Sequence, residues 1–308
     1  MEASITFKGI GKKFQNKTIL AGLNFGVEKG KNFVIVGESG AGKSTMLKIL
    51  IGIVKIDAGI AYVNGKDITS RGPETRSIIG YMPQISDLDK ELTIIDQLII
   101  DAQLHDVDEK KATKSIMNWA EVLDFTQFLS KYPEQLSFGH QRIICFARAL
   151  IHNPEVILLD EPTTGMDPHS RAKIWDTLDR LQTNKTILFT TQNFSEAERY
   201  AERIAILHEG NIKMNGTLDK LIETTQGLTR YRITFSTEPS SEFMKEFSQV
   251  PGIVRPKKKG DEVEFYSRDR KRFFRALEVA MKYELEDIDT TLCRLQDLFV
   301  GLTDGGLE

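Results

Sequence analysis

The spacing of hydrophobic residues along the first two thirds of the chain alternates between two periods. Short apolar or alternating stretches, typical of β-strands, occur near residues 5–7, 23–27, 33–36, 60–63, 78–82, 156–159, 186–190, 203–207 and 211–214. Helical periodicity follows several of them, at about residues 44–52, 93–131, 170–181 and from 195 onward. Strands that alternate with helices predict an α/β core built on a mostly parallel sheet.

Individual residues indicate where some of these elements begin or turn. The pair Asn64-Gly65 follows a strand-like stretch and predicts a tight hairpin turn. Asp108 is a predicted N-cap within the helical stretch 93–131, and Ser137 is a predicted N-cap of the helix that follows it. Ser195 and Glu198 have the spacing of a capping box, so we expect a helix to begin at Ser195.

The order of elements changes after residues 224–227. From there the pattern predicts a strand, a helix, two strands, a helix, a strand and a short final helix, at about 231–235, 241–248, 253–254, 263–265, 269–283, 285–290 and from 295. The order βαββαβ is that of a small α+β domain of the ferredoxin-like type. We therefore expect one domain at residues 1–226 and a second at 227–308.

Composition narrows the class of protein. The 308 residues are 40% hydrophobic and 28% charged, as in a globular protein, and the net charge of −3 does not favour nucleic acid as a partner. Cys145 and Cys293 are far apart, so they predict neither a disulfide framework nor a metal-ligand set, and suit a reducing cytosol. No apolar stretch approaches the roughly 18 residues needed to span a bilayer. Any membrane role is therefore expected to come through a partner.

The strongest chemical signal is the sequence GESGAGKST at residues 37–45. It fits the P-loop pattern G-x-x-x-x-G-K-[ST], between an apolar strand and a helical stretch. Its glycines permit torsions that point successive N–H groups at phosphate oxygens, and the helix N-terminus adds partial positive charge. Lys43 is expected to reach the β- and γ-phosphates, and the Ser44 hydroxyl to ligate Mg²⁺. The predicted phosphate-binding residues are Gly37, Glu38, Ser39, Gly40, Ala41, Gly42, Lys43, Ser44 and Thr45.

Two adjacent carboxylates, Asp160 and Glu161, follow the apolar strand at 156–159. Asp160 is expected to hold the Mg²⁺ shell, directly or through water. Glu161 can accept a proton from the water that attacks the γ-phosphate, or orient that water. An acidic turn residue before Pro162 is the alternative interpretation of Glu161.

Taken in order, these motifs resemble the ATP-binding cassette (ABC) family of ATPases over about residues 4–220. The P-loop matches Walker A, and residues 158–163 match Walker B. The remaining matches are Phe14 at the A-loop, Gln84 at the Q-loop, residues 136–141 (LSFGHQ) at the signature and residues 164–167 at the D-loop. The resemblance implies a P-loop NTPase cassette with a mixed sheet core, an antiparallel β edge and a helical subdomain at about residues 85–150.

The resemblance also implies how the site is completed. Phe14 is expected to stack on adenine, and Gln84 to act at Mg²⁺ and in catalysis. Ser137 and Gly139 of the signature are expected to bind the γ-phosphate of ATP held by a second subunit, with Asp167 of the D-loop also in the nucleotide site. Two cassettes would then face head to tail, closing on ATP and separating after hydrolysis. The implied cofactors are ATP and Mg²⁺.

The chain departs from the family pattern at its signature and at its switch residue. Phe138 replaces the first signature glycine, and His140 replaces the glutamine. Where the family places its switch histidine, this chain has Gln192. A Gln amide can donate a hydrogen bond to a γ-phosphate but cannot carry positive charge or shuttle a proton. Because Glu161 is retained, we expect hydrolysis that is slowed but not absent.

The run at residues 161–168 and the α+β C-terminal domain are similar to those of drug-, antibiotic- and lipid-export ATPases of the ABC-2 type, which work with separate permeases. The resemblance implies an exporter subunit at the cytoplasmic face of the cell membrane. Its expected partners are integral membrane permease subunits and a second ATP-binding subunit, identical or different, with no nucleic acid. Two alternatives stay open: an ATP-gated regulator with weak or no hydrolysis, and a soluble ABC protein that acts on a nucleic-acid or ribosomal partner.

Overall fold

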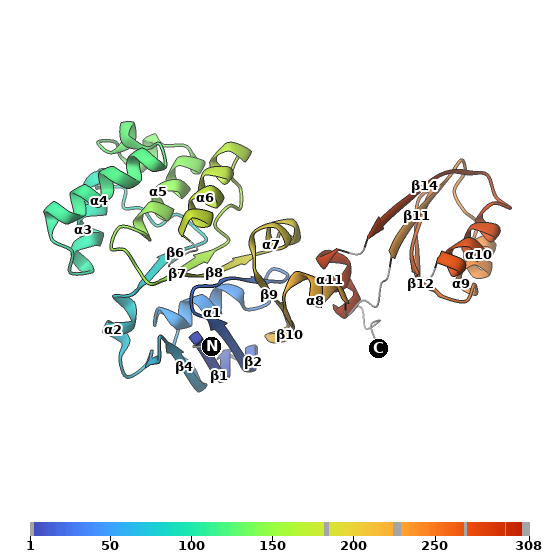
Figure 1. Cartoon of the computed structure of the whole chain (residues 1–308), viewed down its shortest axis with the longest axis horizontal. Coiled ribbons are helices and arrows are strands. Elements are labelled where there is room, and N and C mark those ends of the chain that lie inside the picture. The colour runs from blue at the N-terminus through green and yellow to red at the C-terminus, as the bar shows by residue number, and fades with distance from the viewer. Residues whose placement is uncertain (1–2, 182–184, 224–228, 268–269, 293, 304–308) are drawn as a thin grey trace. The chain divides into compact units, whose positions relative to one another are not determined.

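The chain forms two compact units, Met1–Asn215 and Gly216–Glu308 (Figure 1). The computed structural model describes residues 3–181, 185–223, 229–267, 270–292 and 294–303. The division lies before the expected boundary near residue 226, because helix α8 (Leu218–Glu223) packs with α11 (Leu295–Thr303) of the second unit. Residues 224–227, where the sequence pattern changes, and Cys293 lie outside the described residues.

A six-stranded sheet forms the centre of the first unit. Its strands, in spatial order, are β10 (Asn211–Gly216), β9 (Arg203–His208), β3 (Asn32–Val36), β8 (Thr186–Thr191), β7 (Val156–Asp160) and β6 (Ile79–Met82). Neighbouring strands from β9 to β6 pair in parallel. β3, β7 and β8 are buried at every residue, as continuous apolar runs predict. The parallel α/β core is therefore confirmed, and the carboxyl ends of its strands meet at one edge.

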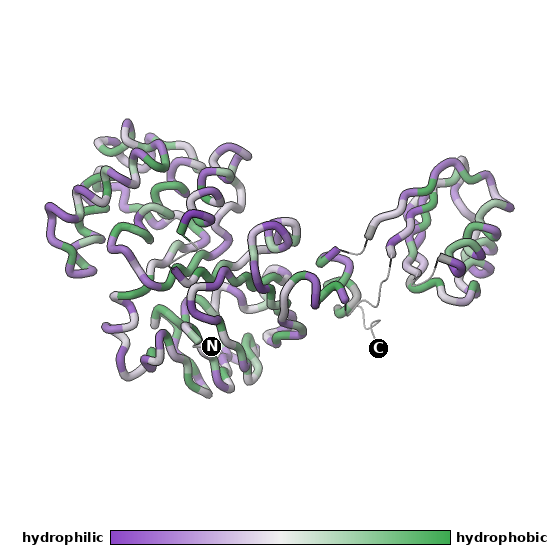
Figure 2. The backbone as a smooth tube through the Cα atoms, viewed as in Figure 1, coloured by the Kyte–Doolittle hydropathy of each residue, from purple (hydrophilic) through white to green (hydrophobic). Residues whose placement is uncertain are grey.

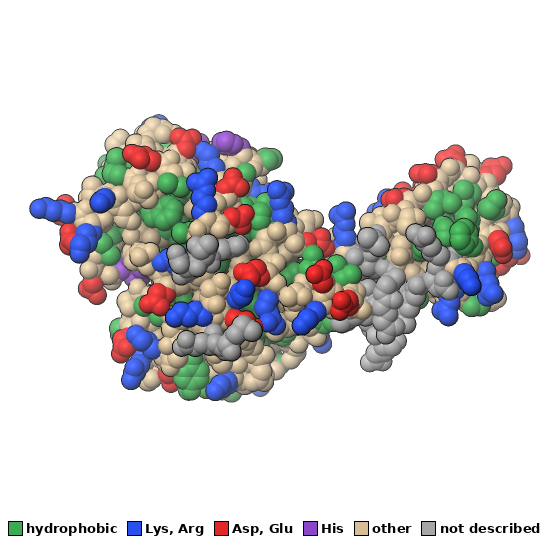
Figure 3. Space-filling model, viewed as in Figure 1, with side chains coloured by type: hydrophobic (Ala, Val, Ile, Leu, Met, Phe, Trp, Pro, Cys, Tyr) green, Lys and Arg blue, Asp and Glu red, His purple; other side chains and the backbone are tan. Residues whose placement is uncertain are grey.

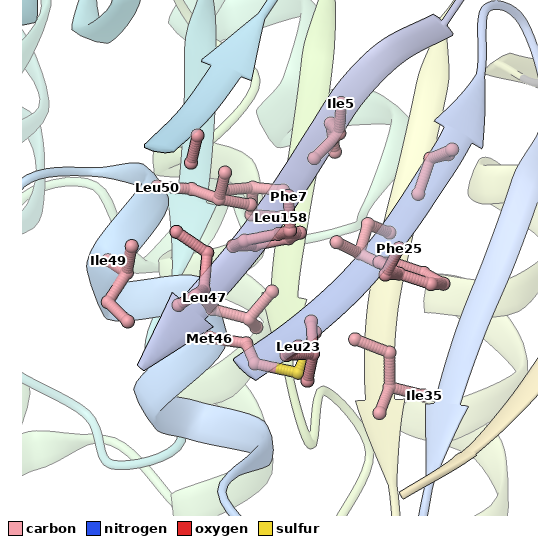
Figure 4. Close-up of a cluster of buried hydrophobic side chains, with 14 of the residues drawn as sticks. Ile5, Phe7, Leu23, Phe25, Ile35, Met46, Leu47, Ile49, Leu50 and Leu158 are labelled. Carbon is pink, nitrogen blue, oxygen red and sulfur yellow. The ribbon is translucent and has the colours of Figure 1, made fainter. Parts of the chain in front are cut away.

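An antiparallel sheet packs beside this core. Its strands, in spatial order, are β2 (Lys17–Glu28), β1 (Ala3–Phe14), β4 (Ala58–Val63) and β5 (Lys66–Asp67). Asn64 and Gly65 join β4 to β5 with φ of 46° and 74°, which confirms the predicted hairpin turn. The first helix, α1 (Lys43–Leu50), contributes Met46, Leu47, Ile49 and Leu50 to a buried cluster that also contains side chains of both sheets (Figure 4).

Helices cover the other face of the central sheet (Figure 1). They are α3 (Ile94–Leu104), α4 (Glu109–Val122), α5 (Phe138–Arg148) and α6 (Pro168–Leu181), while the short α2 (Gly72–Arg76) precedes β6. Asp108 caps α4 as predicted, because its carboxylate accepts hydrogen bonds from the N–H groups of Lys110 and Lys111. The strands at the centre are the most hydrophobic part of this unit (Figure 2). Within the described residues, no helix has the length and apolar character to cross a membrane.

Helix α7 (Phe194–Tyr200) corrects one prediction. Its N-cap is Asn193, whose side-chain oxygen accepts hydrogen bonds from the N–H groups of Ser195 and Glu196. The predicted capping box at Ser195 was wrong, because the carboxamide of Asn193 already satisfies the first free N–H groups of the helix.

The second unit has the predicted order of elements. They are β11 (Thr229–Phe235), α9 (Ser241–Ser248), β12 (Ile253–Lys259), β13 (Glu262–Ser267), α10 (Arg270–Ala280) and β14 (Leu285–Leu292). The sheet order β12-β13-β11-β14, with every pair antiparallel, is the ferredoxin-like arrangement. Its core is aromatic, with Tyr231, Phe243, Phe247 and Phe265 buried together.

The burial of β7 leads to a stability prediction. Leu158 is completely buried in β7, whereas Leu104, at the end of α3, is 77% exposed. Leu158→Ala should lower the free energy of unfolding by about 2 to 5 kcal/mol, because it removes buried methyl groups and leaves a cavity. Leu104→Ala makes the same chemical change at the surface and should stay within about 0.5 kcal/mol. Urea unfolding followed by circular dichroism measures both; equal losses would contradict the described burial.

Candidate functional site

The P-loop runs from β3 into α1, and its backbone is shaped by glycines. Gly40 and Gly42 have φ of 81° and 110°, a region that favours glycine. Gly37 has no room for a side chain, because a Cβ would lie 2.2 Å from the carbonyl oxygen of Leu207. No side chain in the described part of the chain caps α1 at Gly42. The N–H groups of the first turn are therefore available to an anion.

The side chain of Lys43 is almost completely buried, with 4% of it exposed. Its ammonium donates hydrogen bonds to the carbonyl oxygens of Gly37 (2.8 Å) and Glu38 (2.9 Å) and lies 3.7 Å from Glu161 Oε1. Burial lowers the pKa of Lys43, while the carboxylates of Glu161 and Asp160 oppose that shift. A phosphate bound to the P-loop would compete with Glu161 for this ammonium.

Asp160 lies at the buried end of β7 with one carboxylate oxygen satisfied and one not. Oδ1 accepts hydrogen bonds from the hydroxyls of Ser44 (3.0 Å) and Thr190 (2.7 Å). Oδ2 is buried without a hydrogen-bond partner among the described residues. Such an oxygen is costly unless a ligand completes it. A hydroxyl beside a free carboxylate oxygen offers the hard oxygen ligands that Mg²⁺ prefers, so these residues fit the ion predicted here.

Glu161 is 4% exposed, and donors contact both of its carboxylate oxygens. Oε1 accepts a hydrogen bond from Gln192 Nε2 at 2.6 Å, and Oε2 accepts one from the Thr164 hydroxyl at 3.2 Å. Its φ of 46° is uncommon for a residue other than glycine, and its N–H donates to the Thr190 hydroxyl at 3.1 Å. Strained backbone of this kind often accompanies functional sites. The fold therefore brings Lys43, Glu161 and Gln192 into one cluster.

The signature residues form a second cluster. Ser137 caps α5 as predicted: its hydroxyl accepts a hydrogen bond from the N–H of His140 at 3.3 Å and lies 2.8 Å from His140 Nδ1. Gly139 packs against the D-loop, since a Cβ there would lie 3.2 Å from Asp167 Oδ2. Phe138, the residue that replaces a glycine, is half exposed. This cluster presents the start of α5 together with Asp167.

Phe14 and Gln84 stand apart from the buried carboxylates. Phe14 ends β1 and is 47% exposed, with the ammonium of Lys12 5.1 Å from its ring centroid. Gln84 is exposed in the loop after β6. Within the described ranges, no hydrogen bond joins Gln84 to Asp160. Their roles remain predictions from the resemblance.

A mostly polar cavity of about 370 Å³ opens beside the P-loop. Its walls come from the P-loop, the start of β2 and the turn after β9. They are formed by Glu38, Ser39, Gly40, Ala41, Lys17, Thr18, Ile19, His208, Glu209 and Gly210. The position of the cavity allows a ligand to reach the P-loop from outside.

Sequence reasoning missed the hydroxyls that hold the carboxylates. Thr190 contacts both Asp160 Oδ1 and the N–H of Glu161, and Thr164 contacts Glu161 Oε2. Thr190 lies opposite Asp160 in the parallel pairing of β7 with β8. A threonine in an apolar strand gives no signal by itself, so only the register of the strands could have identified it.

Comparisons with known proteins agree with this geometry. Residues 20–164 match the ABC transporter family. The chain is 35% identical over 229 residues to the Nod factor export ATP-binding protein I of Burkholderia orbicola (strain AU 1054), and the match covers 73% of this chain and 74% of that protein.

Solved structures give the same family. The structure of an ATP-binding subunit of an ABC transporter matches with a TM-score of 0.68 at 26% identity, over 72% of this chain and 92% of that one. A dimeric post-hydrolysis ATP-binding cassette bound to ADP and Pi matches with a TM-score of 0.65 at 27% identity, over 70% of this chain and 98% of that one. Because a relative more than 30% identical is covered over most of its length, the chain belongs to the ABC transporter family as an ATP-binding subunit.

Proposed function

We propose that this chain binds and hydrolyses MgATP and thereby drives a membrane transporter, acting as an exporter subunit at the cytoplasmic face. The observation that carries the proposal is the buried cluster of Lys43, Ser44, Asp160 and Glu161 beside the uncapped start of α1. The named function of its relative, Nod factor export, supports the outward direction. Steady-state ATPase activity of the purified chain tests the proposal, with Lys43→Ala as the inactive reference.

The residues of the cluster divide the reaction between them. In the proposed complex, Lys43 exchanges Glu161 for the β- and γ-phosphates. Asp160 Oδ2 and the Ser44 hydroxyl would hold Mg²⁺, which neutralises charge on the phosphates during transfer. Glu161, released from Lys43, orients the attacking water or accepts its proton, while Thr164 continues to hold Oε2.

Thr190 provides a test of the metal site. Thr190→Val removes the hydroxyl that holds Asp160 Oδ1 and the N–H of Glu161 while keeping the shape of the side chain. Loss of such a supporting partner typically weakens metal affinity by about 10- to 100-fold, so Mg²⁺-dependent ATP binding should weaken accordingly. Binding of ATP in EDTA should not change. Isothermal titration in both conditions measures the effect.

The matched control is Thr191→Val, one residue along β8. That hydroxyl donates to Glu196 Oε2 instead of Asp160. Its removal should leave the Mg²⁺ dependence unchanged; the same Mg²⁺ defect in both variants would contradict the role given to Thr190.

Gln192 makes this site unlike that of a cassette with a switch histidine. Its amide already donates to Glu161 Oε1 at 2.6 Å, and it can carry no positive charge. We propose that hydrolysis is slowed for this reason. The same contact favours the second candidate function, an ATP-gated regulator in which binding matters more than turnover.

Replacing Gln192 measures how far it limits the rate. Gln192→His restores a group that can carry a proton, so the ATPase kcat should rise by on the order of tenfold or more, with the KM for MgATP little changed. The assay compares both proteins with the assembled partner present. An unchanged kcat would contradict the idea that Gln192 limits hydrolysis. Gln192→Asn, which keeps an amide, should give no increase and serves as the control.

We propose that a second cassette completes the site. Ser137, Gly139 and Asp167 gather at the start of α5, apart from the chain's own Lys43. The resemblance to the family implies that the start of α5 contacts the γ-phosphate of ATP held by another subunit. The dimeric form of the similar cassette bound to ADP and Pi supports this arrangement.

A permease would dock on a different part of the first unit. A cavity of about 320 Å³ lies where the end of α1, β6, α3 and the end of α5 meet. Its lining includes Ile53, which is 67% exposed, and Leu104 on α3 is 77% exposed. Exposed apolar side chains around a cavity mark interaction sites. By contrast, acidic and basic side chains are intermixed on the face shown in Figure 3, a pattern that does not favour nucleic acid.

Charge substitutions at this surface should separate docking from ATP binding. Ile53→Glu and Leu104→Glu place a carboxylate where an apolar segment would pack, so co-purification with the permease should fall by about tenfold or more. MgATP affinity should not change, because neither residue is among those that line the cavity beside the P-loop. Met117→Glu is the control, because Met117 is exposed on α4 and neither it nor its sequence neighbours line the cavity, whereas Leu104 precedes the lining residue His105. Unchanged co-purification of both variants would place the permease elsewhere.

A further inference from the structure

Arg142, in the middle of α5, is a fully buried arginine whose hydrogen bonds within the described part of the chain all go to backbone carbonyls. Nη1 donates to the carbonyl oxygen of Pro83, and Nη2 donates to those of Glu161 (3.2 Å) and Pro162 (3.4 Å). No carboxylate among the described residues forms an ion pair with it. One guanidinium therefore touches the backbone beside Gln84 and the backbone of the proposed catalytic base.

This arrangement is expensive for stability alone. Burial lowers the pKa of Arg142, yet a guanidinium stays protonated in proteins, so a full charge is held away from water. Its Nε has no hydrogen-bond partner within the described ranges. An apolar side chain of similar size would fill the same space without that cost. Burial of Arg142 does not stabilise the fold, so we attribute its role to the backbone contacts of the guanidinium.

The backbones that Arg142 joins are not joined by the sheet. The parallel pairing of β6 with β7 ends at Met82 and Leu159. Beyond these residues the chain continues as the loop of Gln84 on one side and as Glu161 on the other. Arg142 bridges the gap because its planar fork can donate to several oxygens in fixed directions.

Helix α5 connects Arg142 to the other surfaces of the unit. It starts at the signature, and near its end Arg148 forms ion pairs with Asp87 and Asp101 at the lining of the proposed docking cavity. Asp87 lies in the same loop as Gln84. A displacement of that loop can therefore be transmitted to Arg142 by two routes. One is the hydrogen bond from Arg142 to Pro83, and the other is the Asp87–Arg148 ion pair followed by helix α5.

We propose that Arg142 is a positioning residue that couples the Gln84 loop to Glu161. When the loop moves, the guanidinium carries the carbonyls of Glu161 and Pro162 with it, and so sets the position of the Glu161 carboxylate for hydrolysis. The inference rests on the proposed ATPase function. It predicts that Arg142 acts on turnover and not on nucleotide binding, because none of its hydrogen bonds among the described residues is with the P-loop.

The test uses the full chain with Arg142→Gln and Arg142→Lys, each a shorter donor that cannot reach both backbones. The kcat for MgATP should fall by about 10- to 100-fold, since small misplacement of a catalytic group has effects of that size. The KM and the equilibrium affinity for MgATP should stay within about twofold of wild type. Phe146→Leu, a buried change on the same helix, controls for loss of packing and should leave kcat unchanged. An unchanged kcat in both Arg142 variants, or an equal loss in Phe146→Leu, would overturn the proposal.

A double-mutant cycle distinguishes coupling from independent damage. If Gln84 and Arg142 act on Glu161 through the same coupling, the double variant Gln84→Ala with Arg142→Gln should lose little more kcat than the worse single variant. Losses that multiply would overturn the coupling. A wild-type rate no higher than that of Lys43→Ala would instead overturn the proposed ATPase function, and the role of Arg142 with it.

Hydrogen exchange gives a result even if the Arg142 variants do not fold. In the wild-type chain, MgATP should change the protection of residues 84–87 and 163–166 together. A change confined to one of these segments would overturn the proposal.

Discussion

The way β7 ends determines what the first unit can do with a nucleotide. The strand is buried at every residue and stops at Asp160, so two adjacent carboxylates, Asp160 and Glu161, lie where solvent cannot screen them. Such carboxylates must be paired or hydrogen-bonded. Ser44 and Lys43 come from the start of α1, Thr190 from β8, and Gln192 from just beyond it. The partners of the two carboxylates therefore come from α1, from β8 and from the residue that follows β8.

In the proposed function, the same cluster accounts for a chain that holds a phosphate and yet turns over slowly. Lys43 is shared between P-loop carbonyls and Glu161 Oε1, and Gln192 donates a hydrogen bond to that same oxygen. In the proposed cycle, binding removes the first restraint but not the second. Because an amide donor is neutral, it can hold Glu161 without assisting a proton transfer. In this proposal, nucleotide affinity and turnover are set by different residues, Lys43 for affinity and Gln192 for turnover.

Local signals predicted much of this molecule. The P-loop, the hairpin at Asn64-Gly65, the caps at Asp108 and Ser137 and the βαββαβ order of the second unit each depend on neighbouring residues, and the structure bears out each of these elements. Thr190 and Arg142 could not be predicted this way, since their partners are distant in sequence and meet only through strand register and helix packing. The N-cap at Asn193 was missed although its partners are close in sequence. Asn193 and Ser195 both have the sequence context of an N-cap, and local rules do not decide between them.

In the proposed reaction, Glu161 activates the water that attacks ATP held by Lys43, Ser44 and Asp160. The most direct measurement is a single-turnover assay of Glu161→Gln, with radiolabelled MgATP binding followed on the same sample. The Glu161→Gln variant should bind MgATP with wild-type affinity and form ADP at least about 100-fold more slowly than wild type. ADP formation at the wild-type rate would contradict it, because the base would then have to be another residue.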